Sequence, residues 1–227
     1  LRGLRTGRRN LFVASGLCVG LGLYGYSPFR VAPFVIVLTV VIYLVHRQLS
    51  GARRQVLTGL AVIIVVAFAV FLPLLRYTFE HPENVAYRVL TRLGTLERPL
   101  PGAPGWIFLT NLDRALALFA WNDGNSWVNS VALRPALDVV SGALFHLGVL
   151  LVGLRYWRRR RPLDLALLLS IPMLLLPSVL ALAFPDENPA LNRAAMALVP
   201  VFLISGLTLD TLVRTVRARL GAVPAVA

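Results

Sequence analysis

The sequence contains no lysine, one cysteine and three histidines among its 227 residues. The single cysteine, Cys18, excludes an intrachain disulfide and any zinc site built from cysteines. His46, His81 and His146 lie far apart, and none is followed at the spacing of a helical metal pair by another histidine or a carboxylate. The sequence therefore predicts no metal site on this chain.

Charged residues are also scarce, at 15%, whereas hydrophobic residues make up 57% of the chain and the mean hydropathy is +0.73. This is more apolar surface than an ordinary soluble core buries. The net charge of +13 comes from arginine alone, and such an excess is also typical of nucleic-acid-binding proteins. The arginines punctuate apolar stretches instead of forming one face, so we expect membrane lipids, and no nucleic acid, as partners.

Six apolar runs of nearly spanning length occur along the chain, at residues 11–26, 31–45, 56–75, 135–154, 163–184 and 194–213. Because only helices satisfy their own backbone in lipid, these runs predict an all-α, polytopic membrane protein with about six transmembrane helices. The whole chain, residues 1–227, then forms a single membrane domain. The first two runs are short and predict a helical hairpin that turns at residues 26–30.

Small residues and prolines predict how these helices pack and where they bend. Gly16 and Gly20 form a Gly-x-x-x-Gly pair, which brings the backbone of the first helix close to a neighbouring helix. Pro73, Pro172, Pro177 and Pro200 are expected to kink or end their helices. These motifs indicate packing and carry no information about function.

The arginines cluster at alternate ends of the predicted spans. They gather at the N-terminus, at residues 47–54, at residues 155–161 and at residues 214–219, while most acidic residues lie in the opposite connections. The positive-inside rule therefore predicts a protein of the cytoplasmic membrane with both termini in the cytoplasm. We interpret the arginine-rich run 155–161 as a topology anchor, with a lipid-specific or nucleic-acid patch as the alternative.

The connection between the third and fourth spans, residues 76–134, is too long for a simple linker and predicts structure of its own. Apolar residues at helical spacing predict an interfacial helix over residues 106–120. The following segment combines amides, a carboxylate and aromatic rings, a mixture that suits a sugar. Its candidate sugar- or acceptor-binding residues are Trp121, Asn122, Asp123, Asn125 and Asn129. The alternative is an ordinary interfacial loop with tryptophans at the headgroup level.

Arg30 and Arg193 are each a lone cation beside a turn at the outer end of a predicted span. Placed together they would neutralise a phosphate at the membrane surface, because guanidinium binds phosphate oxygens in a fork. Pairing with lipid headgroups is the alternative. We therefore name Arg30 and Arg193 as candidate lipid-phosphate-binding residues.

Several stretches resemble the C-terminal membrane half of family 39 glycosyltransferases of the GT-C superfamily, the bacterial relatives of protein mannosyltransferases and of the aminoarabinose lipid A transferase. The stretches are residues 20–30, 111–119, 122–125, 134–138 and 187–193. The resemblance implies a GT-C-like fold and transfer of a sugar from a polyprenyl-phosphate donor to an acceptor on the non-cytoplasmic face, often with a divalent metal. It places Arg30 and Arg193 near the leaving phosphate and Asp123 and Asn125 near the sugar or acceptor. Tyr24, Tyr26, Asn111 and Arg114 lie in the same stretches and are expected to support the site.

The chain departs from the family pattern in one respect. The family's catalytic carboxylate lies in its first outer loop, and this sequence has no matching segment, so we expect the chain to be part of a longer protein, inactive alone and without a catalytic residue. Half of a membrane transporter or flippase is the main alternative, although such proteins usually need ionisable groups at membrane depth. A passive membrane scaffold is a third possibility, for which the long outer connection would be superfluous.

Overall fold

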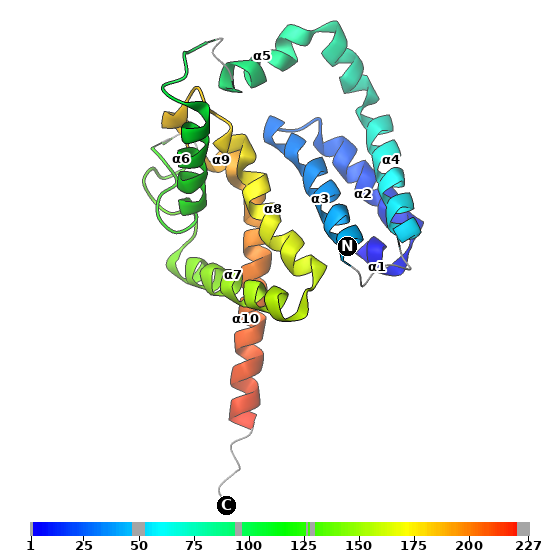
Figure 1. Ribbon diagram of the computed structural model, residues 1–227, viewed down its shortest axis with the longest axis vertical. Coiled ribbons are helices and arrows are strands. Elements are labelled where there is room, and N and C mark those ends of the chain that lie inside the picture. Colours follow the sequence, from blue (N-terminus) through cyan, green and yellow to red (C-terminus); the bar gives the residue numbers. More distant parts are fainter. Residues whose placement is uncertain (1, 47–52, 94–96, 126, 128–129, 222–227) are drawn as a thin grey trace, which may run out of the picture.

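The computed structural model describes residues 2–46, 53–93, 97–125, 127 and 130–221, and every regular element in these ranges is a helix (Figure 1). In chain order the elements are α1 (Arg2–Thr6), α2 (Arg9–Gly22), η1 (Ser27–Val31), α3 (Ala32–Val45), α4 (Arg53–Glu80), α5 (Pro82–Leu93), α6 (Pro104–Ala117), α7 (Val139–Arg159), α8 (Pro162–Val179), η3 (Pro185–Glu187), α9 (Leu191–Ala194), η4 (Ala195–Ala197) and α10 (Leu198–Gly221). The all-α prediction is therefore confirmed for the described part of the chain.

Helix starts follow local chemistry. Proline occupies one of the first two positions of η1, α3, α6, α8 and η3, where its fixed φ suits a helix and its missing N–H is not needed. Helix α7 instead begins with a side-chain cap, because Asp138 Oδ1 accepts hydrogen bonds from the backbone N–H groups of Val140 (2.9 Å) and Ser141 (3.0 Å).

Five apolar helical segments are long enough to cross a membrane: Ser27–Val45, Arg53–Glu80, Val139–Arg159, Pro162–Val179 and Leu191–Gly221. They correspond to the second to sixth predicted spans, although several bounds differ from the prediction by five or more residues. The first predicted span contains only the shorter helix Arg9–Gly22. Fourteen residues reach about 21 Å, short of the ~30 Å of a hydrocarbon core. The segments indicate an integral membrane protein, while their orientation across the membrane stays a prediction.

The helices form two groups, which lie on opposite sides in Figure 1. The N-terminal helix group comprises α1–α4, and its main contact is between α2 and α4. A Cβ added at Gly16 would lie 2.9 Å from the Ile63 carbonyl oxygen, and one at Gly20 would lie 2.9 Å from the Ala67 carbonyl oxygen. The predicted Gly-x-x-x-Gly pair thus does bring two helix backbones together.

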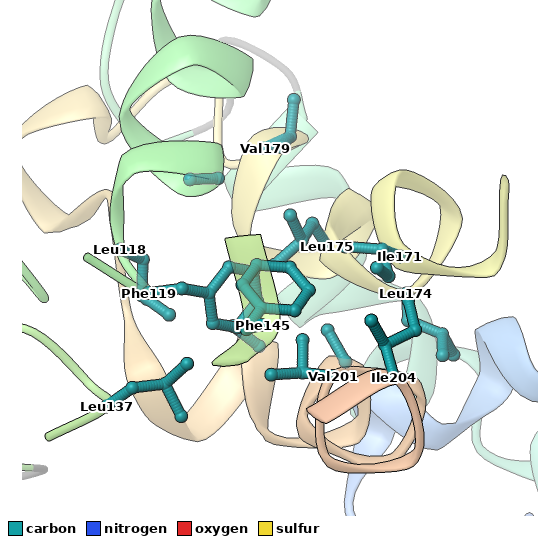
Figure 2. Close-up of a cluster of buried hydrophobic side chains, with 13 residues drawn as sticks. Leu118, Phe119, Leu137, Phe145, Ile171, Leu174, Leu175, Val179, Val201 and Ile204 are labelled. Carbon is teal, nitrogen blue, oxygen red and sulfur yellow. The ribbon is translucent and has the colours of Figure 1, made fainter. Parts of the chain in front are cut away.

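The C-terminal helix group comprises α6–α10 and contains a cluster of buried apolar side chains (Figure 2). Leu175 and Val179 of α8 and Ile204 of α10 are fully buried in it, and Phe119 meets Phe145 of α7 edge-on, with ring centroids 5.4 Å apart. Helix α8 contacts α6, α7, α9 and α10, so it is the central helix of this group.

Several connections join the groups. Helix α3 and η1 pack against α8, and α5 crosses from the end of α4 to the C-terminal helix group (Figure 1). We call the end of the molecule that carries η1, α5, η3 and α9 the α5 end. The opposite end carries α1, the start of α4 and the α7–α8 turn, and α10 extends beyond it. The arginine clusters at both termini of the chain, at α4 and at the α7–α8 turn thus lie at the end opposite α5.

Candidate functional site at the α5 end

A chain of buried hydrogen bonds holds α6, the end of α8 and the segment before α9 together. Asn111 Nδ2 of α6 donates to the carbonyl oxygen of Val179 (3.0 Å), which the end of α8 leaves without a helical partner. Asn188 Nδ2 donates to the backbone oxygen of Asn111 (2.8 Å), and Asn188 Oδ1 accepts from the Ser178 hydroxyl (2.6 Å). All three side chains are buried, so these bonds fix the segment 185–190 against α6 and α8.

Glu187 is the centre of an ion-pair cluster beside this network. Its carboxylate accepts from Arg92 Nη1 of α5 (2.8 Å) and, through its other oxygen, from Arg193 Nη2 of α9. The Arg92 guanidinium also lies 4.1 Å from the centre of the Phe184 ring. Burial alone would raise the pKa of Glu187, but the hydrogen bonds and positive charges of Arg193 and Arg92 outweigh it and lower the pKa.

The predicted sugar-binding segment packs against the same place. Gly124 has φ of +94°, and a Cβ there would collide with the carbonyl oxygen of Pro189. The turn is held by the Gly124 N–H, which donates to Asn122 Oδ1 (2.7 Å), and by the Asp123 N–H, which donates to the Arg134 carbonyl oxygen (2.9 Å). Residues 122–124 and 187–193, two separate motifs in the sequence, therefore lie in contact.

Three buried polar atoms around this contact lack a hydrogen-bond partner within the described residues: Asn111 Oδ1, Asp123 Oδ1 and Arg193 Nη1. The Asp123 residue is only 3% exposed and the Arg193 side chain 18%. Unpaired buried polar atoms are costly, so they are typical of places that bind something. Here they include one cationic donor and one carboxylate acceptor.

Arg30 lies at the same end of the molecule, in η1. The neighbouring Tyr26 accepts a hydrogen bond at its hydroxyl from Asn192 Nδ2 (3.0 Å), the residue next to Arg193. Arg30 itself is half-buried and makes no side-chain hydrogen bond or ion pair within the described residues. The expectation that it is a lone cation agrees with this finding, whereas Arg193 is paired with Glu187 and is not alone.

An apolar cavity of about 200 Å³ lies between α2, α3 and α4 in the N-terminal helix group. Leu23 precedes η1 and Pro33 follows it, and both line the cavity with Val19 of α2 and Phe68 of α4. Arg30 thus occurs in the chain between two residues of the cavity wall. The cavity has the chemistry of a site for hydrocarbon, and the α5 end has the chemistry of a site for a charged headgroup.

The remaining predicted site residues have other roles or places. Tyr24 donates its hydroxyl to the Val70 carbonyl oxygen of α4 (2.8 Å), so it anchors α2 to α4. Trp121 is 81% exposed, and Asn125 and Arg114 are exposed as well. Asn129 falls outside the described residues.

No group of three or more histidine, cysteine or carboxylate side chains that would hold a metal ion occurs in the described ranges.

The sequence prediction missed Arg92 and Asn188, and it gave Glu187 no role in the site. Asn188 had a local signal, because an Asn-Pro step that follows an apolar run typically starts a turn at a helix end. Arg92 had none, since its partner Glu187 is 95 residues away in the sequence.

Comparison with known protein families, with curated proteins and with solved structures finds no match to this chain.

Proposed function

We propose that this chain is part of an integral-membrane glycosyltransferase that moves a sugar from a polyprenyl-phosphate donor to an acceptor on the non-cytoplasmic face. The proposal rests on the sequence resemblance and on one structural observation. Arg193 keeps Nη1 buried and unpaired while Glu187 holds Nη2, so the guanidinium presents one fixed donor toward a ligand. Phosphate oxygens are the natural acceptors for such a donor.

The structure offers chemistry suited to each of the three parts of the donor. The apolar cavity between α2, α3 and α4 suits the polyprenyl chain, and Arg30 and Arg193 suit the phosphate. Asp123 carries an unpaired carboxylate oxygen, which suits a sugar hydroxyl. The exposed ring of Trp121, two residues away, offers a face for the apolar side of a sugar.

In the proposed reaction, an acceptor oxygen attacks the anomeric carbon, and the bond from that carbon to the phosphate oxygen breaks. The electron pair leaves with the polyprenyl phosphate, and the acceptor proton passes to a base. The arginines stabilise the negative charge that develops on the departing phosphate in the transition state, and this stabilisation accelerates the reaction. The resemblance places the base in a segment with no match in this chain, so no residue described here takes that role.

The test uses membranes that contain the complete polypeptide and a labelled polyprenyl-phosphate sugar. Arg193→Gln and Arg30→Gln are each expected to lower transfer by at least about tenfold, because one charge-assisted bond to a phosphate contributes about 1.5–3 kcal/mol. Arg219→Gln, at the far end of α10, serves as the control and leaves the rate unchanged. Substrate flux through proteoliposomes without any sugar transfer would instead establish the transporter alternative.

A further inference from the structure

The turn between α7 and α8 carries four consecutive arginines, residues 158–161, and all four are exposed. None of them forms an ion pair within the described residues. Arg76 of α4 and Arg214 of α10, by contrast, each pair with a carboxylate one turn away. The turn therefore carries a local excess of four positive charges.

The nearby acidic side chain does not offset this charge. Asp164, in the first turn of α8, is buried and accepts two hydrogen bonds from Arg155 of α7, from Nε (2.8 Å) and Nη2 (2.6 Å). Both oxygens of the Asp164 carboxylate are thus hydrogen-bonded to Arg155, and this bidentate pair links the end of α7 to the start of α8. The four arginines are thus displayed from a fixed turn.

The geometry of the turn keeps the arginines together. Arg160 ends α7 in the left-handed region, with φ of +47°, and its guanidinium lies 5.5 Å from the ring centres of both Tyr156 and Trp157. Cation–π contacts at this distance hold the side chain over the rings. Trp157 is itself 74% exposed, so an aromatic surface adjoins the charges.

An exposed apolar stripe leads along α7 to this turn. Leu147, Leu150, Leu154 and Trp157 follow one another at three- or four-residue steps, so they share one helix face, and all are exposed. The stripe and the arginines are continuous: hydrocarbon surface ends at Trp157 and positive charge begins at residue 158. This order matches an acyl chain followed by a phosphate.

We propose that the α7–α8 turn binds an anionic phospholipid, with its phosphate on the arginines and an acyl chain along the α7 stripe. Nucleic acid would use the charges alone, whereas the adjoining apolar stripe favours lipid. The proposal does not rest on the sugar-transfer function, because this turn lies at the end of the molecule opposite α5 (Figure 1).

The test measures which lipid lies beside Trp157. The full chain keeps Trp157 as its sole tryptophan through Trp106→Phe, Trp121→Phe and Trp127→Phe, and is placed in nanodiscs of phosphatidylcholine and phosphatidylglycerol. In matched samples either lipid carries brominated chains, which quench tryptophan fluorescence on contact. Brominated phosphatidylglycerol is expected to quench Trp157 several-fold more effectively than brominated phosphatidylcholine at the same mole fraction.

Charge removal at two places separates a specific site from a general effect. Arg158→Gln, Arg159→Gln and Arg161→Gln together are expected to bring the quenching ratio close to one. Arg214→Gln, Arg217→Gln and Arg219→Gln remove the same charge from α10 and should leave the ratio unchanged. The single change Arg159→Gln should lower it partway, which keeps the test valid if the triple variant misfolds.

Three results would overturn the proposal. One is equal quenching by both lipids in the chain with all its arginines. Another is an equal loss of preference in the α10 variant, which would show a response to net charge only. The third is binding of a single-stranded oligonucleotide in phosphatidylcholine nanodiscs that requires the same three arginines, which would identify nucleic acid as the partner.

Discussion

Helices α2 and α4 meet through glycine, whereas α6 and α8 meet through amide and hydroxyl groups. Gly20 lets the two backbones of the first pair approach without any polar side chain between them. In the second pair Asn111 and Asn188 supply buried hydrogen bonds, and Oδ1 of Asn111 stays buried and unpaired. The contact between α2 and α4 at Gly20 thus leaves no polar group to be paired, while the contact between α6 and α8 includes a buried polar atom without a hydrogen-bond partner. Ligand chemistry is expected where polar groups are buried but incompletely paired.

The largest expected effect is loss of the buried amide that holds the C-terminal contact. Asn188→Leu removes the acceptor of the Ser178 hydroxyl hydrogen and a donor to the Asn111 carbonyl oxygen, both buried, and should lower the free energy of unfolding by about 3 kcal/mol. Reversible denaturation in mixed micelles measures this change. Asn192→Leu is the control, because it removes an exposed bond to Tyr26 and a local bond from the Arg193 N–H, and should cost less than about 1 kcal/mol. Equal losses would show that burial of the amide does not matter.

A smaller effect is expected from a methyl group placed between α2 and α4. The Cβ of Gly20→Ala would lie 2.6 Å from Val70 Cβ and 2.9 Å from the Ala67 carbonyl oxygen, so the helices must separate, at a cost of about 1–3 kcal/mol. Gly153→Ala places its methyl group in open space on α7 and should instead stabilise by about 0.5–1 kcal/mol. Opposite signs in the same denaturation assay support the close approach. A neutral Gly20→Ala would contradict it.

The smallest effect concerns the ion pairs of Glu187. Because its pKa lies below the ordinary value of 4.5, this carboxylate stabilises the folded state above about pH 4.5, and the stabilisation is lost as the pH falls through the lowered pKa. The carboxylate is 39% exposed, so solvent screening limits the contribution to about 1 kcal/mol or less. Thermal midpoints in detergent should fall as the pH drops below 4.5.

Two variants identify the group responsible for that decline. Glu187→Gln removes the titrating carboxylate, so the part of the decline that comes from this group should disappear. Glu80→Gln breaks an exposed pair on α4 and should leave the pH dependence as it was. A pH dependence unaltered by Glu187→Gln would assign the effect to other carboxylates.

The sequence predicted the five long apolar helices because apolar runs mark them directly, but it predicted their ends poorly and did not predict α5. Helix α4 continues to Glu80, five residues beyond the apolar run, and α10 continues to Gly221. Charged residues beyond the apolar runs pair one turn apart, as Arg76 does with Glu80 and Arg214 with Asp210. These pairs stabilise the helix, so α4 and α10 continue past the point where the charged residues begin. The first span was predicted through residue 26, whereas α2 ends at Gly22.

The candidate site was predictable only in part. Asn111 lies four residues before the fully buried Ala115 on the inner face of α6, so its burial could have been inferred from helical spacing. The pairing of Glu187 with Arg92 and Arg193 could not, because it depends on how η3, α5 and α9 meet. Contacts of this kind follow from tertiary structure and leave no periodic pattern in the sequence.

The order of synthesis constrains when the bond between Arg92 and Glu187 can form. Arg92 emerges from the ribosome 95 residues before its partner, and Tyr26 emerges 166 residues before Asn192. Both early residues therefore stay unpaired until the end of α8 and the start of α9 have been synthesised. The hydrogen bonds of Arg92 with Glu187 and of Tyr26 with Asn192 therefore form only after these later residues have been translated, and a nascent chain stalled before Glu187 lacks both bonds.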